Sequence, residues 1–304
     1  MRFSVSVAAV LAMFAVLAGP AAGATVKNVN RGETPAGIRS YWTSERMAQA
    51  MEMSSEGPVF TPAGSDATSS ALASALRHQP ARNAPSAIGK LYLRWLGYRA
   101  TCSGAVINTP SQRLVLTAGH CLKYLGVWSD HLMFVPAYDH GRRPFGSYSW
   151  KTAWITGPWA RNSSGKVDNY DMGIIVTRRT WNGKRIGNMV GSLDYRAFPR
   201  RSGRTKILGY PAGSNRAREV RKCTVGTWAG PFYSFRLPGP VGKTARCNMA
   251  PGSSGGPWMT AYPDGFGGTD WLVDGVTSTG FRRQLATPYF GSHFRQLVYN
   301  AENR

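Results

Sequence analysis

Three short segments of this 304-residue chain carry residue types that together can perform nucleophilic catalysis. One apolar stretch ends in His120, a second begins at Asp171, and a glycine-rich segment contains Ser254. A serine hydroxyl becomes a nucleophile when a base takes its proton, and a carboxylate orients the imidazole that serves as that base. Because each role is supplied once, we predict His120 as general base, Asp171 as orienting acid and Ser254 as nucleophile.

The glycines around Ser254 predict a sharp turn of the backbone. Glycine adopts conformations that other residues avoid, so the segment from Gly252 to Gly256 can expose the serine hydroxyl. We expect the N–H groups of Gly252 and Ser254 to form an oxyanion hole there. Taken singly, each segment has a plainer explanation in packing, strand capping or a Gly-Ser linker, and only their combination favours catalysis.

The other candidate residues predict no second site. Asp168 lies three residues before Asp171 in a polar loop, where we expect it to be solvated. His131, His140 and His293 have no cysteine, histidine or carboxylate at the spacing of metal ligands. The sequence therefore predicts neither a metal nor a cofactor.

The elements that must position these residues are short strands. Apolar or alternating runs separated by Gly, Pro and Asn turns are typical of a β-sandwich or β-barrel. The runs cover residues 90–95, 102–107, 114–117, 132–136, 172–177, 206–210, 220–228 and 271–278. A polar stretch at residues 178–205 would join two halves of similar size. The apolar spacing of residues 294–298 predicts a C-terminal helix capped by Ser292.

Residues 1–24 have the pattern of a secretory signal peptide. Arg2 precedes an apolar run at residues 7–17, and small residues at 22–24 form a cleavage site. An exported chain enters an oxidising compartment, where its four cysteines favour two disulfides. We therefore expect a secreted protein that has no membrane attachment after the signal is removed.

Residues 25–87 differ in composition from the rest of the chain. They hold six Lys and Arg against five Asp and Glu, whereas residues 88–304 hold 30 against 10. A Met-rich helical stretch at residues 44–53 is followed by a run rich in Ser, Ala, Pro and Gly. We interpret residues 25–87 as a weakly ordered propeptide of a zymogen, although a disordered extension that stays attached would have the same composition.

Four segments resemble, in the same order, the signature segments of the chymotrypsin-like (trypsin-fold) serine peptidases. They are Cys102-Ser-Gly-Ala-Val-Ile107, Thr117-Ala-Gly-His-Cys121, Asp171-Met-Gly-Ile-Ile175 and Gly252-Ser-Ser-Gly-Gly-Pro257. The segment at residues 252–258 and the ending Thr287-Pro-Tyr-Phe-Gly291 look most like secreted bacterial members of the glutamyl endopeptidase-like group. The resemblance covers about residues 88–300.

This resemblance implies an all-β peptidase domain at residues 88–304 that includes a short C-terminal helix. Its two six-stranded antiparallel β-barrels would lie at about residues 88–178 and 195–285, with the active site between them. The family's cysteine pairing implies the disulfides Cys102–Cys121 and Cys223–Cys247. The same match assigns the catalytic and oxyanion-hole roles to the residues given above.

Two departures from the family bear on activation and specificity. Trypsin has an Asp directly before the nucleophile, where this chain has Ser253, and glutamyl endopeptidases place a His where this chain has Thr277. The residues expected to line the substrate pocket are all uncharged: Asn248, Met249, Thr277 and Ser278. A buried Lys or Arg of a substrate would lack a partner there, so we predict cleavage after uncharged or acidic residues.

The sequence thus predicts a secreted, monomeric serine endopeptidase that hydrolyses protein or peptide substrates through an acyl-enzyme. A non-catalytic basic binding module on the same fold is one alternative, but such a module would usually have lost a catalytic residue. A serine esterase is less favoured, because that fold needs the order Ser, acid, His and alternating strands and helices. The net charge of +22 favours contact with anionic extracellular polymers, whereas no nucleic-acid-binding motif accompanies it.

Overall fold

The computed structural model describes most of the chain after the predicted signal peptide. The described residues are 24–54, 57–59, 79–81, 83–162, 168–180, 182–212, 217–230, 239–249, 251–281 and 283–304. Residues 1–23 of the predicted signal peptide and residues 60–78 of the predicted propeptide lie outside them. Within the described ranges, none of the helices has the length and apolar content needed to cross a bilayer.

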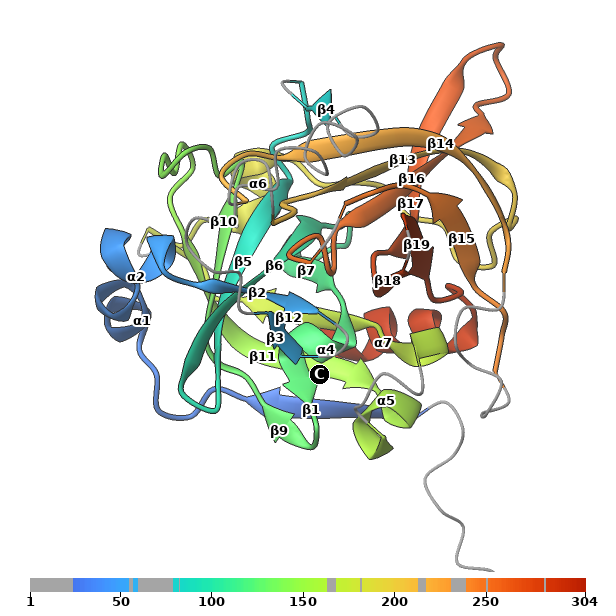
Figure 1. Cartoon of the computed structure of the whole chain (residues 1–304). Helices are drawn as coiled ribbons and strands as arrows, with labels where there is room; N and C mark the ends of the chain where they lie inside the picture. Colours follow the sequence, from blue (N-terminus) through green and yellow to red (C-terminus); the bar gives the residue numbers. More distant parts are fainter. Residues whose placement is uncertain are drawn as a thin grey trace, which may run out of the picture.

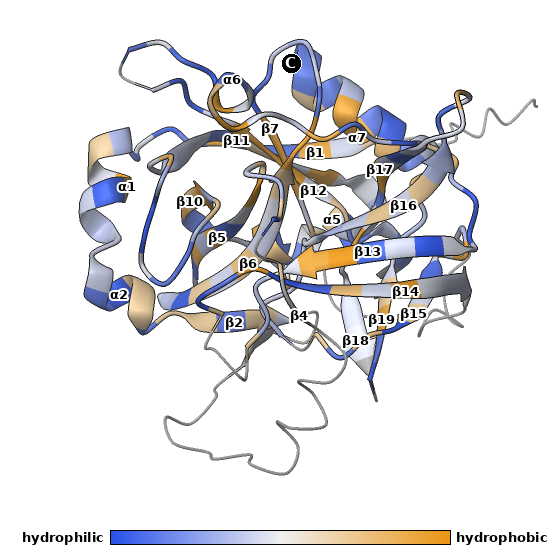
Figure 2. Ribbon diagram, turned by 90° about the horizontal axis from the view of Figure 1, so that it is seen from above, coloured by the Kyte–Doolittle hydropathy of each residue, from blue (hydrophilic) through white to orange (hydrophobic). Residues whose placement is uncertain are grey.

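Six antiparallel strands close into a barrel in the first half of the chain (Figure 1). In spatial order they are β5 (Ile88–Trp95), β10 (Asp130–Pro136), β11 (Tyr148–Thr156), β12 (Gly173–Thr177), β7 (Leu114–Thr117) and β6 (Tyr98–Val106), which pairs back with β5. Helix α7 (Ser292–Asn303) packs on the outside of β11 and β12. Every residue of β7 and β12 is consequently buried, and both strands are continuously apolar over most of their length (Figure 2).

The second half forms an antiparallel sheet that does not close. Its strands are β13 (Gly203–Gly209), β14 (Arg221–Ala229), β15 (Lys243–Arg246), β16 (Pro257–Pro263), β17 (Thr269–Val276), β18 (Thr279–Phe281) and β19 (Gln284–Thr287), with β17 and β18 at the two edges. The sequence predicts a second closed barrel, and the described residues form a half-barrel instead. Between the edge strands, Thr277 exchanges backbone hydrogen bonds with Gly255 and Gly256 at 2.7 and 2.9 Å. These bonds hold the backbone between β17 and β18 against the Ser254 segment, and not against the strand at the other edge of the sheet.

Short elements lie in the segments before and between these strands. They are β4 (Gln79–Pro80), α4 (Gly119–Leu122), β8 (Lys123–Tyr124), β9 (Val127–Trp128), α5 (Gly157–Arg161), the 3-10 helix η1 (Asp168–Tyr170) and α6 (Ile186–Val190). All eight predicted strand runs overlap observed strands, and the polar stretch 178–205 does connect the two halves. The C-terminal helix is also present, but its N-cap is Gly291, and no side chain caps it, in contrast to the predicted role of Ser292.

The segment expected to be a weakly ordered propeptide is folded over residues 24–54. It forms β1 (Thr25–Val29), α1 (Pro35–Tyr41), α2 (Ser44–Ala48) and β2 (Met51–Ser54), followed by β3 (Gly57–Val59). Strand β1 pairs with β11, and β2 adds to β6 in parallel orientation (Figure 1). The prediction of weak order was wrong here, because Ile38, Trp42, Met47 and Met53 are buried in the core. Only the first half of the predicted helix at residues 44–53 is helical, since residues 51–54 form strand β2, which pairs with β6 and β3.

Both predicted disulfides are confirmed. Cys102 of β6 is bonded to Cys121 of α4, and Cys223 of β14 is bonded to Cys247, just after β15. Each bridge lies within one sheet and its adjoining loop, and all four sulfurs belong to buried residues. The first bridge fixes the short helix that carries His120.

Replacing Cys102 and Cys121 together by alanine should lower the free energy of unfolding by about 3 kcal/mol, because the bridge closes a loop of 19 residues in the unfolded chain. Urea denaturation of the oxidised wild type and the double variant measures this difference. The Cys223→Ala/Cys247→Ala variant, which opens a loop of 24 residues, is the matched control and should lose a similar amount. A loss below about 1 kcal/mol for the first variant would contradict the constraint.

Candidate active site

The pairing of β7 with β12 brings His120 and Asp171 together. The two strands are antiparallel and Thr117 pairs with Gly173, so the end of β7 and the start of β12 lie at the same edge of the barrel. His120 follows β7 in α4, and Asp171 directly precedes β12. The imidazole Nδ1 lies 2.7 Å from Asp171 Oδ2, and the His120 backbone N–H donates to Oδ1 at 2.7 Å. Both side chains are fully buried.

Asp171 has a third hydrogen-bond donor from the other half of the molecule. The hydroxyl of Ser278, just after β17, donates to Asp171 Oδ2 at 2.6 Å. Gly119 makes the close approach of α4 possible, because a Cβ there would lie 2.8 Å from Trp159 Cδ1 and 3.0 Å from Asp171 Oδ1. With Nδ1–H directed at the carboxylate, Nε2 of His120 is the nitrogen left to accept a proton. Nε2 is buried and has no hydrogen-bond partner among the described residues.

The Ser254 segment lies against the first barrel. Gly252 and Gly255 have φ angles of 92° and 78°, in the left-handed region that favours glycine. A Cβ on Gly255 would lie 2.1 Å from Thr117 Oγ1 and 2.4 Å from the Ser103 carbonyl oxygen, so no other residue fits beside the end of β7. Ser103 of β6 holds the segment: its N–H donates to the Ser254 carbonyl at 2.7 Å, and its hydroxyl donates to the Gly252 carbonyl at 2.9 Å. These contacts place Ser254 beside the strand end that carries His120.

The hydroxyl of Ser254 has its hydrogen bond elsewhere. It donates to the backbone carbonyl of Met53 in β2 at 3.2 Å, and the Gly252 N–H donates to the same oxygen at 3.3 Å. Ser254 is only 5% exposed. No pattern in the sequence indicates that residues 51–54 reach this site, because they are about 200 residues away along the chain and pair with β6 only after folding.

The four residues predicted to line the substrate pocket have different surroundings. Asn248 is half-buried, whereas Met249 is fully buried in the core of the second sheet with Trp258. Thr277 accepts a hydrogen bond from Trp258 Nε1 at 3.0 Å, and Ser278 donates to Asp171. The assignment of these residues to a pocket stays a prediction. The contact of Ser278 with Asp171 joins residues 107 positions apart, and the sequence analysis did not anticipate it.

Asp274 is the buried carboxylate nearest in sequence to the predicted pocket strand. It forms an ion pair with Lys243 and accepts hydrogen bonds from Thr260 Oγ1 at 2.9 Å and Tyr262 OH at 2.8 Å. Burial lowers the pKa of Lys243, and Asp274 opposes that shift. The charge of Asp274 is therefore balanced within the second sheet, where the carboxylate is fully buried.

A buried lysine interacts electrostatically with Glu52 of β2. Lys90 of β5 is only 4% exposed, its Nζ donates to the Ala217 carbonyl at 3.1 Å, and it lies 5.3 Å from the ring centres of Tyr92 and Tyr138. Burial lowers the pKa of Lys90 to about 8, while the charge of Glu52 raises it. Reciprocally, burial raises the pKa of Glu52 and Lys90 lowers it. The sequence gave no indication that Lys90 and Glu52 interact, because Lys90 is a single lysine in an apolar strand.

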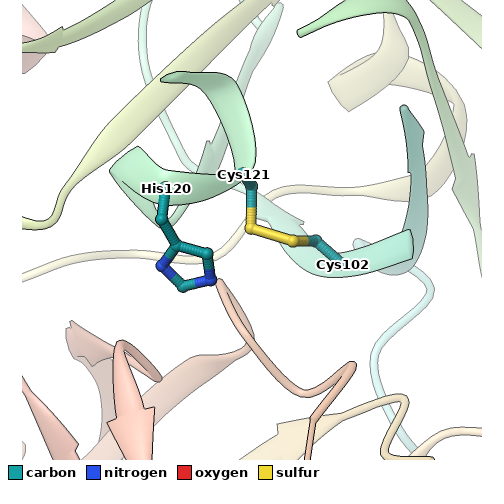
Figure 3. Close-up of side chains that lie close together, drawn as sticks. All are labelled: Cys102, His120 and Cys121. Carbon is teal, nitrogen blue, oxygen red and sulfur yellow. A yellow bond between two sulfur atoms is a disulfide. The ribbon is translucent and has the colours of Figure 1, made fainter. Parts of the chain in front are cut away.

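Two groups have the composition of a metal site. The first combines His120 with Cys102 and Cys121, but the two sulfurs are bonded to each other and are not thiolate ligands (Figure 3). The second combines Glu33, Asp130 and His131, with Nδ1 of His131 lying 2.6 Å from Glu33 and 3.1 Å from Asp130. Asp130 also binds Arg94 through two hydrogen bonds of 2.7 Å. The second group therefore acts as an ion-pair cluster that ties Glu33 to the barrel.

Comparisons with known proteins support the fold. No protein-family model matches the chain, and no curated protein matches its sequence. Among solved structures, the protease Anisep from Arthrobacter nicotinovorans is 28% identical, with a TM-score of 0.64 over 75% of this chain and 100% of that one. The thermostable serine protease AL20 from an extremophilic microorganism is 25% identical, with a TM-score of 0.63 over 72% and 99%. The chain has the chymotrypsin fold.

More distant structures share only that fold. A Glu endopeptidase in complex with MPD is 18% identical, with a TM-score of 0.57 over 75% of this chain and 97% of that one. Human heparin binding protein is also 18% identical, with a TM-score of 0.51 over 73% and 94%. The chymotrypsin-fold neighbours thus include serine proteases, which supports a protease function in general. They also include heparin binding protein, whose name refers to binding and not to proteolysis.

The buried Lys90 predicts a rise in stability between pH 8 and 10.5. The unfolded chain keeps this proton up to the ordinary lysine pKa of 10.5, whereas the folded protein releases it near 8. Between these values the unfolded state binds more protons, so the free energy of unfolding increases with pH. Relative to a Lys90→Met variant, the wild type should gain roughly 1–2 kcal/mol from pH 7.5 to 9.5.

Urea denaturation at both pH values measures this gain, and the difference between the two proteins cancels the other titrating groups. Lys151→Met removes an exposed lysine of β11 and is the matched control, for which we expect no such pH-dependent difference. A constant difference between wild type and Lys90→Met across this range would show that Lys90 is not desolvated.

Proposed function

We propose that this protein is an extracellular serine endopeptidase that uses His120, Asp171 and Ser254. The observation that supports it most is the buried imidazole, with Nδ1 2.7 Å from Asp171 Oδ2 and Nε2 left without a partner among the described residues. This arrangement fixes the tautomer that a general base needs. Ser254 follows on a glycine turn packed against the same strand end.

In the proposed reaction, Ser254 Oγ attacks the carbonyl carbon of the scissile peptide bond as its proton passes to His120 Nε2. The N–H groups of Gly252 and Ser254 stabilise the negative charge that develops on the carbonyl oxygen. The tetrahedral intermediate expels the amine, which takes the proton from Nε2, and an acyl-enzyme remains. Water then attacks the acyl carbon, gives its proton to Nε2, and releases the carboxylate product and the free serine hydroxyl.

Asp171 acts as a positioning and charge-stabilising group in this proposal. It accepts hydrogen bonds from His120 and from Ser278, which hold both oxygens in place. The positive charge on the imidazole forms only while the proton resides on Nε2, and the fixed carboxylate stabilises it at that moment. Because the carboxylate is fully buried, this interaction is screened little by salt.

The proposed location is outside the cell. Two disulfides are typical of proteins that fold in an oxidising compartment, and the predicted signal peptide at residues 1–24 supplies the export route. The 30 Lys and Arg of residues 88–304 against 10 Asp and Glu would also hold the protein near anionic extracellular polymers. That attraction adds to the peptidase function and does not replace it.

Ser254 should be the serine that an organophosphorus probe labels in the protein recovered from the medium, identified by peptide mass spectrometry. Labelling should depend on the His120 imidazole, because the serine hydroxyl reacts only when a base takes its proton. His120→Ala should lose nearly as much activity as Ser254→Ala, and Asp171→Asn should lose about 10⁴-fold. Asp168→Asn is the matched control for the carboxylate and should retain activity. Labelling of a different serine, or undiminished labelling of Ser254→Ala, would refute the assignment.

The protease should cleave after uncharged or acidic residues more readily than after Lys or Arg. Asp274, the buried carboxylate beside the predicted pocket strand, is already paired with Lys243, and the predicted pocket residues carry no charge. A basic side chain would therefore be desolvated without a partner. Cleavage of a mixed peptide library by the processed protein, read by mass spectrometry, measures the preference. A profile dominated by Arg and Lys before the cut would contradict it.

A further inference from the structure

The catalytic residues proposed above are inaccessible to a polypeptide in this structure. His120 and Asp171 have no exposed surface, and Ser254 is 5% exposed. An endopeptidase must bring the carbonyl of a long chain to its serine, so something occupies the place of that chain. The occupant is β2, whose Met53 is fully buried.

Met53 presents its backbone carbonyl to the groups that would act on a substrate carbonyl. The oxygen accepts the Ser254 hydroxyl at 3.2 Å and the Gly252 N–H at 3.3 Å. Two consequences follow for the chemistry. The serine proton is directed to Met53 and away from His120 Nε2, and one of the two proposed oxyanion donors is already used.

We propose that residues Met51–Ser54 are an internal ligand of the active site, which keeps the enzyme inactive until this segment is displaced. The proposal rests on the proposed function and adds the regulation of the same site. The ligand is a named strand of this chain, held at its backbone by β6 and the Ser254 segment and at its side chain by a charge.

The backbone part of the binding site is the free edge of β6. Met51 pairs with Ala100 and Glu52 with Thr101 in parallel register. Only two residues further along β6, Ser103 holds the Ser254 and Gly252 carbonyls. The strand edge that positions the nucleophile segment is therefore the same edge that β2 covers, so a substrate strand and β2 compete for it.

Glu52 supplies the charged part. Its side chain is 8% exposed, and its Cγ would lie 2.9 Å from a Cβ on Gly252, so its stem crosses directly over the glycine turn. The cation that acts on it is Lys90, itself buried in β5 and bonded to the Ala217 carbonyl. Arg218 is a further cation near Lys90. A carboxylate at position 52 therefore offsets positive charge that would otherwise be desolvated on one side of the cleft.

The rest of the N-terminal segment fastens β2 to the barrel. Strand β1 pairs with β11 over five residues, from Thr25 with Thr156 to Val29 with Thr152. Trp42 is 1% exposed, and its Nε1 donates to the His131 carbonyl at 2.6 Å. Glu33 accepts the His131 N–H at 2.8 Å and the Trp150 Nε1–H at 2.7 Å. Because the segment before it is anchored in this way, β2 is delivered to the site at a high effective concentration.

The test compares Glu52→Lys with Glu45→Lys in the full chain. Glu52→Lys places a third cation beside Lys90 and Arg218 and should expel β2, whereas Glu45 is an exposed residue of α2 in the same segment and receives the same charge change. The first readout is the rate at which an organophosphorus probe labels Ser254. The second is hydrogen exchange of β6 and of residues 251–256, which requires no catalysis. Near-UV circular dichroism checks that each variant is folded, and Met53→Gly, which removes the buried side chain, serves as a second displacing variant.

The probe reacts in proportion to the fraction of molecules in which the site is open, so Glu52→Lys should label roughly tenfold faster or more than wild type. Exchange at residue 101 and at Gly252 should rise with it, and Glu45→Lys should match wild type in both readouts. Equal labelling rates in wild type, Glu52→Lys and Met53→Gly would overturn the internal ligand while leaving the proposed function intact. Absence of labelling in every folded variant, despite faster exchange, would refute the nucleophile itself and with it the regulation.

Discussion

The carboxylate of Asp171 is the group on which the arrangement of the site depends. It accepts hydrogen bonds from the His120 backbone, the His120 imidazole and the Ser278 hydroxyl, at 2.6 to 2.7 Å. These donors come from α4 and from the segment after β17, so one fully buried charge joins the closed barrel to the half-barrel. A buried carboxylate without donors would cost several kcal/mol, and this cost makes the relative position of the two halves specific.

Asp171 and Asp274, two of the buried carboxylates in the described part of the chain, are balanced in different ways, and the difference matters chemically. Asp274 is neutralised by the ammonium group of Lys243 and accepts hydrogen bonds from two hydroxyl groups. Its negative charge is therefore compensated inside the second sheet. Asp171 is held by neutral donors and by an imidazole. Its charge is therefore available to the positive charge that would appear on His120 in the proposed reaction. A buried carboxylate paired with a cation suits a structural role. A buried carboxylate held by neutral hydrogen-bond donors suits a catalytic role.

The N-terminal segment shows how the same physical principles serve folding and control. Its anchors are ordinary core contacts: the buried indole of Trp42, the strand pairs of β1 and the ion-pair cluster around Glu33. Strand β2 is different, because Met53 accepts a hydrogen bond from Ser254 and because the charge of Glu52 acts on Lys90, whose pKa burial lowers. In the proposed regulation, the charge of this near-neutral segment that acts at the site is that of Glu52.

The sequence by itself determined the class of fold, the strands around His120, Asp171 and Ser254, and the cysteine pairs. These features follow from local patterns and from a resemblance carried by short contiguous motifs. Strands such as β11 and β16 were missed, because buried Ser149, Thr152 and Thr260 break the apolar alternation. The buried hydroxyl of Thr260, for example, is satisfied by Thr205 and Asp274, which are distant from it in the chain.

The tertiary structure decided the contacts between residues far apart in the chain. Ser278 reaches Asp171 across 107 positions, and Met53 reaches Ser254 across 201. It also decided that residues 24–54 are ordered, since Trp42 and Met53 gain burial only against a barrel formed by later residues. Composition reports how much apolar surface a segment has, but not whether a complementary surface exists elsewhere in the chain. That complementarity, and the charge environment it creates around Glu52 and Lys90, exists only once the chain has folded.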